Sequence, residues 1–247
     1  MRTAFLPSAG LGKRLRPMTE RIPKPLLPIA GEPMICHVMR HCAASGVQRF
    51  IVNTSHLPDA FEVAFPDHEW EGLPIEFVYE PERLETGAGL KNIEHLLDPE
   101  EPLLVYNSDI LTDISLADLY RNHDEFNRPL VTLASTRAGQ ELHLCTDDDG
   151  RLLRVDREPT QDGGKRLQFL GIALIEPGFL QFLQKDTPES IIHGWTRSLA
   201  ADPHSVRTCE IDMGRWQDIG TLAAYESVRE TGLGSHGISL KNPSTAS

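Results

Sequence analysis

Two kinds of hydrophobic pattern alternate along the first half of the chain, and their order most strongly limits the possible folds. Short apolar runs rich in β-branched residues predict strands at Thr3 to Pro7, Arg49 to Thr54, Ile75 to Tyr79, Leu103 to Asn107 and Leu130 to Ser135. Segments of helical period lie between them. This alternation is typical of an α/β fold, so we expect a mixed, mainly parallel central sheet covered by helices.

The first of the intervening helices has the clearest pattern. Ile35, Val38, Met39 and Cys42 follow the spacing i, i+3, i+4, i+7, and Gly46 ends the stripe. Two further helices are predicted, over Thr86 to Leu97 and over Ser115 to Phe126, the second with Ser115 as its N-cap.

After residue 136 the pattern changes to paired strands. The sequence TDDDG predicts a hairpin turn, since calcium loops need alternating acids that this stretch lacks. Further elements are predicted as a strand over 167–175, a helix over 189–201, a strand over 206–211 and a helix over 222–230. Residues 231–247 are rich in Gly and Ser without a period, so we expect one domain over 1–230 and a disordered tail over 231–247.

The charge balance excludes some classes of partner. The chain carries 24 basic and 36 acidic side chains, a net charge of −12, which argues against binding nucleic acid or membrane through bulk charge. It has no apolar run long enough to span a membrane, no leader-like start and no CxxC pair, which favours a cytoplasmic protein. Residues 1–26 are the exception, with six basic side chains and one acid, and this basic segment suggests a small anionic ligand.

That basic segment follows the first strand and has the composition of a phosphate loop. Gly10 and Gly12 allow backbone amides to approach a phosphate, and Lys13 and Arg14 lie beside them, while Lys24 sits between two prolines. The spacing fits neither a Walker A loop nor a GxGxxG dinucleotide loop. Alone, the pattern would also fit a glycine-rich turn with a solvated basic face.

The longer stretch GLGKRLRPMTERIPKPLLPIAGEPM, residues 10–34, closely resembles the motif GxGxRLxPxTxxxPKPLxPIxGxPM of the sugar-phosphate nucleotidyltransferase family. The resemblance implies a Rossmann-like, GT-A-like nucleotidyltransferase fold and a reaction in which an NTP and a sugar 1-phosphate give an NDP-sugar and pyrophosphate. It also implies that Ala9, Gly10, Gly12, Lys13 and Arg14 bind the nucleotide, and that Lys24 faces the reacting phosphate.

Two acids match the family's metal ligands. Asp109 follows the apolar strand that begins at Leu103, with Ser108 where the family usually has Gly. Asp218 lies in GRWQDIGTLAAY, which resembles the family segment WxDIGTPxxY. The resemblance implies that both hold Mg²⁺, an ion that prefers oxygen ligands, and that Asp109 acts in catalysis with Lys24 and Arg14. Each acid alone would also fit a turn or a helix cap.

The stretch EPERLETGAGLKNI resembles the family's base- and ribose-binding segment, which implies nucleotide-binding roles for Glu80, Thr86 and Gly87. Its ETG form is most similar to N-acetylmuramate 1-phosphate uridylyltransferases and related guanylyltransferases. We therefore expect uridylyl transfer to N-acetylmuramate 1-phosphate, with UTP as the nucleotide. Guanylyl transfer from GTP to mannose or heptose 1-phosphate is the alternative, and a non-catalytic regulatory protein that binds nucleotide-sugar is a second one.

The sugar side matches the family less well. Many members carry Glu-Lys-Pro where this chain has DREP, so Arg157 is the candidate for the lysine's role. Gly171 matches a glycine that lies against the sugar, and Asn107 completes the candidate sugar-binding residues.

One further cluster has metal-ligand character. Cys36, His37, His41 and Cys42 fall within seven residues, and the two histidines share a helical face. Because Cys42 belongs to the apolar stripe, a buried helix with hydrogen-bonded imidazoles is the favoured interpretation over a zinc site.

Overall fold

The parallel part of the central sheet follows the predicted strands. The computed structural model describes residues 2–139, 141, 143–156, 164–211, 213–233 and 238–239. Strands β6 (Leu73–Tyr79), β4 (Arg49–Thr54), β1 (Thr3–Pro7) and β7 (Leu103–Tyr106) lie side by side in that order, all parallel. The short edge strand β5 (Glu69–Trp70) pairs antiparallel with β6. These strands confirm the α/β prediction.

The sheet becomes mixed beyond β7. The long strand β12 (Lys165–Ile175) runs antiparallel to β7 and to β9 (Val131–Thr136), and β13 (Val206–Glu210) pairs in parallel with β9. The predicted hairpin is formed by β10 (Leu144–Thr146) and β11 (Leu152–Val155), and it extends from the first residues of β12. The predicted mixed sheet is therefore confirmed.

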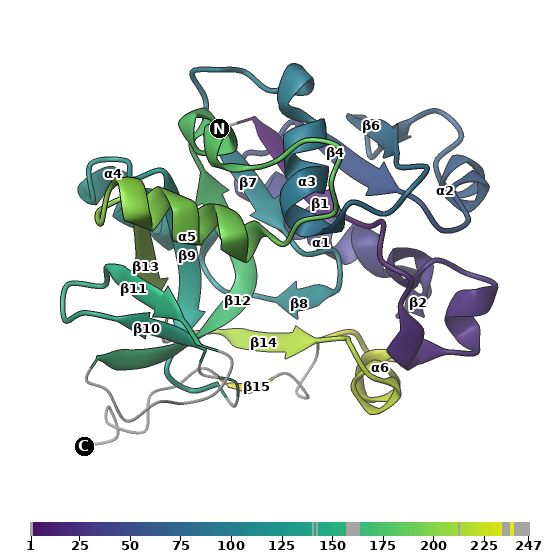
Figure 1. The fold of residues 1–247 in the computed structure, drawn as a ribbon. Coiled ribbons are helices and arrows are strands. Elements are labelled where there is room, and N and C mark those ends of the chain that lie inside the picture. Colours follow the sequence, from purple (N-terminus) through teal and green to yellow (C-terminus); the bar gives the residue numbers. More distant parts are fainter. Residues whose placement is uncertain are drawn as a thin grey trace.

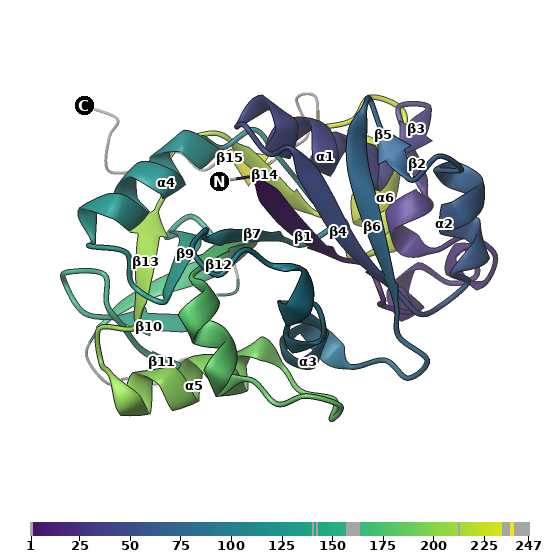
Figure 2. The ribbon, with the colours of Figure 1, turned by 90° about the horizontal axis from the view of Figure 1, so that it is seen from above.

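Helices cover both faces of this sheet, as Figure 2 shows. Helices α1 (Met34–Ala44) and α4 (Leu116–Glu125) lie on one face, and α3 (Glu85–Asn92) and α5 (Ile191–Ala201) lie on the other. Side chains alternate between the two cores: Ala4 and Leu6 of β1 pack on the α1 side, and Phe5 packs on the α3 side. Helix α2 (Asp59–Ala64) packs at the α1 side through Phe61.

A third apolar core joins the N-terminal loop to helix α6. The N-terminal loop forms the 3-10 turns Lys13–Leu15, Met18–Glu20 and Lys24–Leu26 and the short hairpin of β2 (Pro28–Ile29) and β3 (Glu32–Pro33). Helix α6 (Leu222–Val228) packs against this loop, and the Tyr225 hydroxyl donates to the Pro28 carbonyl at 2.9 Å. Figure 1 shows α6 beside β2, although the two elements come from opposite ends of the described chain.

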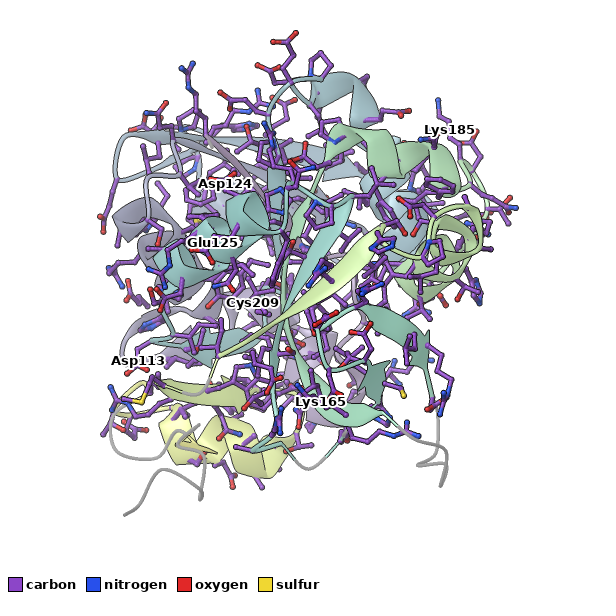
Figure 3. All side chains as sticks on the ribbon, turned by 90° about the vertical axis from the view of Figure 1, so that its left-hand side faces the viewer. Asp113, Asp124, Glu125, Lys165, Lys185 and Cys209 are labelled. Atoms are coloured by element: carbon purple, nitrogen blue, oxygen red, sulfur yellow. The ribbon has the colours of Figure 1, made fainter. Side chains whose placement is uncertain are left out.

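A small second sheet lies under the main one. Strand β14 (Arg215–Asp218) pairs antiparallel with β8 (Ile110–Thr112) and with β15 (Ile238–Ser239). Asp113, labelled beside β14 in Figure 3, accepts hydrogen bonds from the Arg215 backbone N–H at 2.5 Å and from its guanidinium at 2.6 and 2.8 Å. Of the predicted tail, residues 234–237 and 240–247 lie outside the described residues.

The two histidines of helix α1 make hydrogen bonds within the protein. His41 contacts the Tyr106 hydroxyl through Nδ1 at 3.0 Å and the Ile114 carbonyl through Nε2 at 2.9 Å, and Cys36 and Cys42 are buried beside it. Within the described ranges, no three His, Cys, Asp or Glu side chains are placed to hold a metal ion. The remaining 3-10 turns are Glu94–Leu96 and Pro177–Phe182. None of the described helices is long and apolar enough to cross a membrane.

Candidate active site

The carboxyl ends of three parallel strands form the floor of a cavity. Strands β1, β4 and β7 end at the same edge, where ligands bind in open α/β sheets. The cavity has a volume of about 340 Å³, and its lining includes Pro7, Ala9, Gly10, Asn53, Arg83, Glu85, Thr86, Asn107 and Asp109. Four residues predicted to bind nucleotide or sugar (Ala9, Gly10, Thr86 and Asn107) thus line the same cavity as the predicted metal ligand Asp109.

The predicted phosphate loop folds back on itself at Gly12. This glycine has φ +57°, and a Cβ there would lie 2.8 Å from Thr19 Cγ2 and 3.1 Å from Lys24 Cβ. The Thr19 hydroxyl donates to the Gly12 carbonyl at 2.9 Å and fixes the return of the chain. A residue without a side chain is therefore required where Lys24 comes back to the loop. Lys13 and Arg14 are exposed to solvent.

Lys24 and Asp109 form an ion pair at the centre of the site. The lysine side chain is only 12% exposed and the aspartate side chain 29%. Ser108, which replaces the family's usual glycine, is buried and donates its hydroxyl to the Pro7 carbonyl at 2.6 Å. Ser108 thus ties the end of β7 to the end of β1 and holds Asp109 at the edge of the sheet.

Asp218 is brought to Asp109 by the second sheet. Asp218 pairs with Ile110 across β14 and β8, and the Ile219 amide donates to the Asp109 carbonyl at 2.9 Å. Burial raises the pKa of the Asp218 carboxyl, and the nearby Asp109 carboxylate raises this pKa further. Its Oδ1 atom is buried without a hydrogen-bond partner. Burying a carboxylate oxygen without a hydrogen-bond donor costs free energy, and a bound cation would offset this cost.

Gly220 keeps Arg14 close to Asp218. A Cβ on Gly220 would lie 2.5 Å from Arg14 Nη2 and 2.7 Å from Asp218 Oδ1. A side chain at this position would displace the guanidinium or the carboxylate from the places they occupy here. Sequence reasoning did not select Gly220, although it belongs to the motif segment that contains Asp218.

A second cavity opens on the other side of Arg14 and Asp218. It has a volume of about 310 Å³, and hydroxyl and amide side chains from four different elements or loops contribute to its lining (Thr136, Gln168, Gln217 and Thr221). Sequence reasoning selected none of the four. Gln217 and Thr221 lie in the motif segment that contains Asp218, whereas Thr136 and Gln168 are single polar residues in strands, which carry no pattern of their own. Arg14 and Asp218 therefore line this cavity, and Asp109 lines the first.

The predicted base-binding segment divides into residues that line the cavity and residues that support it. Thr86 lines the first cavity. Gly87 packs α3 against the chain before α5: its amide donates to the Glu189 carbonyl at 2.8 Å, and a Cβ on it would lie 2.8 Å from that oxygen. Glu80 is 1% exposed and lies beneath Asn53.

The predicted sugar-binding residues are only partly described. Asn107 and Gly171 lie together, since the backbone N–H of Asn107 donates to the Gly171 carbonyl at 2.9 Å. Gly171 has φ +77°, and the Asn107 carboxamide lies too close to leave space for a side chain on it. Arg157 lies outside the described residues.

The two aspartates fit the predicted magnesium ion. Asp109 and Asp218 offer hard carboxylate oxygens, one of them buried and unpartnered, and two carboxylates are the number that Mg²⁺ commonly takes from a protein when phosphates and water supply its other ligands. Lys24 and Arg14 stand beside them and balance further negative charge. The arrangement is suited to holding polyphosphate rather than to nucleophilic catalysis by a side chain.

Comparisons with known proteins show the family. Residues 4–233 match the family model described as nucleotidyl transferase. Mannose-1-phosphate guanylyltransferase of Mycobacterium tuberculosis is 34% identical over 215 residues, covering 86% of this chain and 59% of that protein. Mannose-1-phosphate guanyltransferase of Aspergillus fumigatus is 30% identical over 224 residues, covering 88% of this chain and 60% of that one. The chain thus spans about three fifths of the length of these relatives.

Solved structures share the fold. The crystal structure of HddC from Yersinia pseudotuberculosis complexed with GMP-PN has a TM-score of 0.74 and 20% identity, covering 93% of this chain and 99% of that one. A putative glucose-1-phosphate thymidylyltransferase from Bacillus anthracis has a TM-score of 0.78 and 15% identity, covering 95% and 96% of the two chains. At these identities the likeness establishes the α/β fold.

Proposed function

This chain belongs to the nucleotidyl transferase family, and from that premise we propose that it transfers a nucleotidyl group from an NTP to a sugar 1-phosphate and releases pyrophosphate. One observation carries the proposal: Lys24, Arg14, Asp109 and Asp218 converge from distant segments, with Asp109 lining one cavity and Arg14 and Asp218 lining the other. A reaction between two anions needs such a cluster of cations and metal-binding carboxylates.

The two cavities fit the two substrates. The nucleoside triphosphate occupies the cavity that contains Ala9, Gly10 and Thr86, with its phosphates on the basic loop. The sugar 1-phosphate occupies the cavity lined by Gln168 and Thr221, whose polar side chains suit sugar hydroxyls. Its phosphate then lies near Asp218 and faces the α-phosphate of the nucleotide.

For the finer specificity, we propose guanylyl transfer from GTP to mannose 1-phosphate in place of the uridylyl transfer that the ETG segment suggested. The two relatives described above, at 34% and 30% identity, are both named for guanylyl transfer and for mannose 1-phosphate. This similarity extends over more than four fifths of the chain, whereas the uridylyl interpretation rests on one short segment.

The chemical step follows from the charges. An oxygen of the sugar phosphate attacks the α-phosphorus and forms the new P–O bond, while the bond to the β-phosphate oxygen breaks and its electron pair leaves with pyrophosphate. The attacking oxygen is already anionic, so no general base is needed. Lys24 balances charge at the α-phosphate, and Arg14 balances charge on the leaving phosphates. Holding the two reactants in line removes several kcal/mol, on the order of 7, from the barrier.

Asp109 and Asp218 would hold the Mg²⁺ ion. When bound, this ion neutralises phosphate charge and orients phosphate oxygens. Lys24 now pairs with Asp109, so its ammonium is already positioned beside the acid that would carry the metal, within reach of the same phosphates.

The test is a matrix of the four NTPs against mannose, glucose, heptose and N-acetylmuramate 1-phosphates, scored by pyrophosphate release. We expect the highest rate with GTP and mannose 1-phosphate. A highest rate with UTP and N-acetylmuramate 1-phosphate would restore the uridylyl assignment. Release of pyrophosphate in none of the combinations would overturn the enzymatic function.

A further inference from the structure

A buried hydrogen-bond chain connects the two loops that frame the nucleotide cavity. The backbone amide of Ser8, where the phosphate loop begins, donates to Asn53 Oδ1 at 2.6 Å. Asn53 Nδ2 donates to Glu80 Oε1 at 2.7 Å, and Glu80 Oε2 accepts from the Leu84 amide at 3.1 Å. Leu84 directly precedes α3, so the chain runs from the phosphate loop to the predicted base-binding segment.

The members of this chain have little contact with solvent. Asn53 is 3% exposed, Glu80 is 1% exposed and Ser8 is 5% exposed. Helix α3 closes over the pair at Gly89, where a Cβ would lie 2.9 Å from Glu80 Oε1 and 3.0 Å from Asn53 Nδ2. Both carboxylate oxygens of Glu80 and both polar atoms of the Asn53 carboxamide are therefore engaged inside the protein.

This geometry does not fit the direct nucleotide-binding role that the motif implies for Glu80. Its carboxylate faces Asn53 and the Leu84 amide, so a base in the cavity meets Arg83, Glu85 and Thr86 instead. We infer that Asn53 and Glu80 are positioning residues, which set the distance between the phosphate loop and the start of α3 and thereby preorganise the nucleotide cavity. The inference rests on the proposed function only in taking this cavity as the nucleotide site.

The acid and the amide of this pair can be exchanged between positions 53 and 80 without losing a hydrogen bond. In Asn53→Asp, two carboxylates face each other and the donor to Glu80 is lost. In Glu80→Gln, one amide N–H of the glutamine must face another donor, either Asn53 Nδ2 or the Leu84 amide. In the double variant N53D/E80Q, the introduced aspartate accepts from the Ser8 amide and from the glutamine amide, and the glutamine oxygen accepts from Leu84. The double variant thus keeps every hydrogen bond and the same net charge.

The experiment measures the affinity of each variant for MgGTP and MgUTP by calorimetry, without a sugar phosphate, together with the urea midpoint of unfolding. We expect each single variant to weaken nucleotide binding at least about tenfold, equivalent to about 1.4 kcal/mol, and the double variant to return to within about threefold of the wild type. In turnover assays, the KM for NTP should follow these affinities while the KM for the sugar phosphate stays unchanged.

Glu176→Gln is the matched control, since Glu176 pairs with His123 and Arg128 away from both cavities. This variant should lower the urea midpoint without changing nucleotide affinity. The inference is overturned if the double variant binds nucleotide no better than the weaker single variant, because Glu80 would then act through direct contact with the base. It is also overturned if the single variants bind like the wild type, or if the wild type binds no NTP.

Calorimetry needs no turnover, so the two proposals can fail separately. A wild type that binds MgGTP, loses affinity in the single variants and regains it in the double variant supports the positioning role even if no combination of substrates yields pyrophosphate. Conversely, an active wild type whose double variant fails to recover would leave the proposed function intact and remove the positioning role.

Discussion

At the scale of single residues, the site places charge where folding alone would not favour it. Asp218 carries a buried, unpartnered oxygen, and burial together with the Asp109 carboxylate raises the pKa of its carboxyl. A carboxyl group whose pKa is higher in the folded than in the unfolded protein contributes to folding stability at pH values below its unfolded pKa. This contribution is lost as the pH rises through the folded pKa. Ionised Asp218 therefore destabilises the metal-free protein at neutral pH.

Asp218→Asn should accordingly raise the urea midpoint of the metal-free protein at pH 7, because the substitution removes a buried charge. The gain should shrink as the pH falls toward the ordinary aspartate pKa of about 4, where the wild-type carboxyl becomes protonated. Pyrophosphate release by the same variant should fall by about two orders of magnitude or more, since one of the two carboxylates that would hold Mg²⁺ is lost. A variant that is less stable than the wild type at pH 7 would contradict this account of Asp218.

At the scale of secondary-structure elements, the sequence predicted the strands of the main sheet but not those of the small one. The apolar runs of β1 and β4 set their positions to the residue, since both are buried and bounded by clear breaks. Strands β8 and β14 have three and four residues, too few for a period to emerge, and Leu111 of β8 and Ile219 after β14 belong to the apolar core that α6 shares with the N-terminal loop. The motif resemblance pointed to Asp109 and Asp218 as the proposed metal ligands, and the pairing of β8 with β14 brings the two acids together.

Helix α1 gives a prediction about pH. Its His41 contacts the Ile114 carbonyl through Nε2 and the Tyr106 hydroxyl through Nδ1, a pattern that holds the imidazole neutral, and burial lowers the pKa of His41. Because the pKa of His41 is lower in the folded protein than its ordinary value of 6.5, the neutral imidazole contributes folding stability above pH 6.5. This contribution is lost as the pH falls through the folded pKa.

His41→Gln should therefore be less stable than the wild type at pH 7, with a smaller difference at about pH 5.5, roughly one unit below the ordinary histidine pKa. Chemical unfolding at the two pH values measures both differences, and subtracting the wild type removes the contribution of the other histidines. An equal difference at both pH values would mean that the pKa of His41 is the same in the folded and unfolded states.

At the scale of the whole molecule, the fold brings the N-terminal loop and the segment around α6 to one place. Lys24 and Arg14 come from the N-terminal loop, Asp109 from the middle of the chain and Asp218 from the strand before α6, and the third apolar core holds these segments together through Leu15, Leu27 and Ile219. This closure could not be predicted from the sequence, because no local pattern relates residues 15–34 to residues 219–228. The same closure separates the two proposed substrate cavities.

The central claim is that Asp109 and Asp218 together hold the divalent ion through which the nucleotide binds. Its most direct test is the affinity for GTP measured by calorimetry with MgCl₂ and with EDTA, in the wild type, Asp109→Asn, Asp218→Asn and the control Asp113→Asn, whose acid pairs with Arg215 in the same small sheet. We predict that Mg²⁺ strengthens binding at least about tenfold in the wild type and the control, and that this dependence disappears in both site variants. Equal dependence on Mg²⁺ in all four proteins would contradict the account.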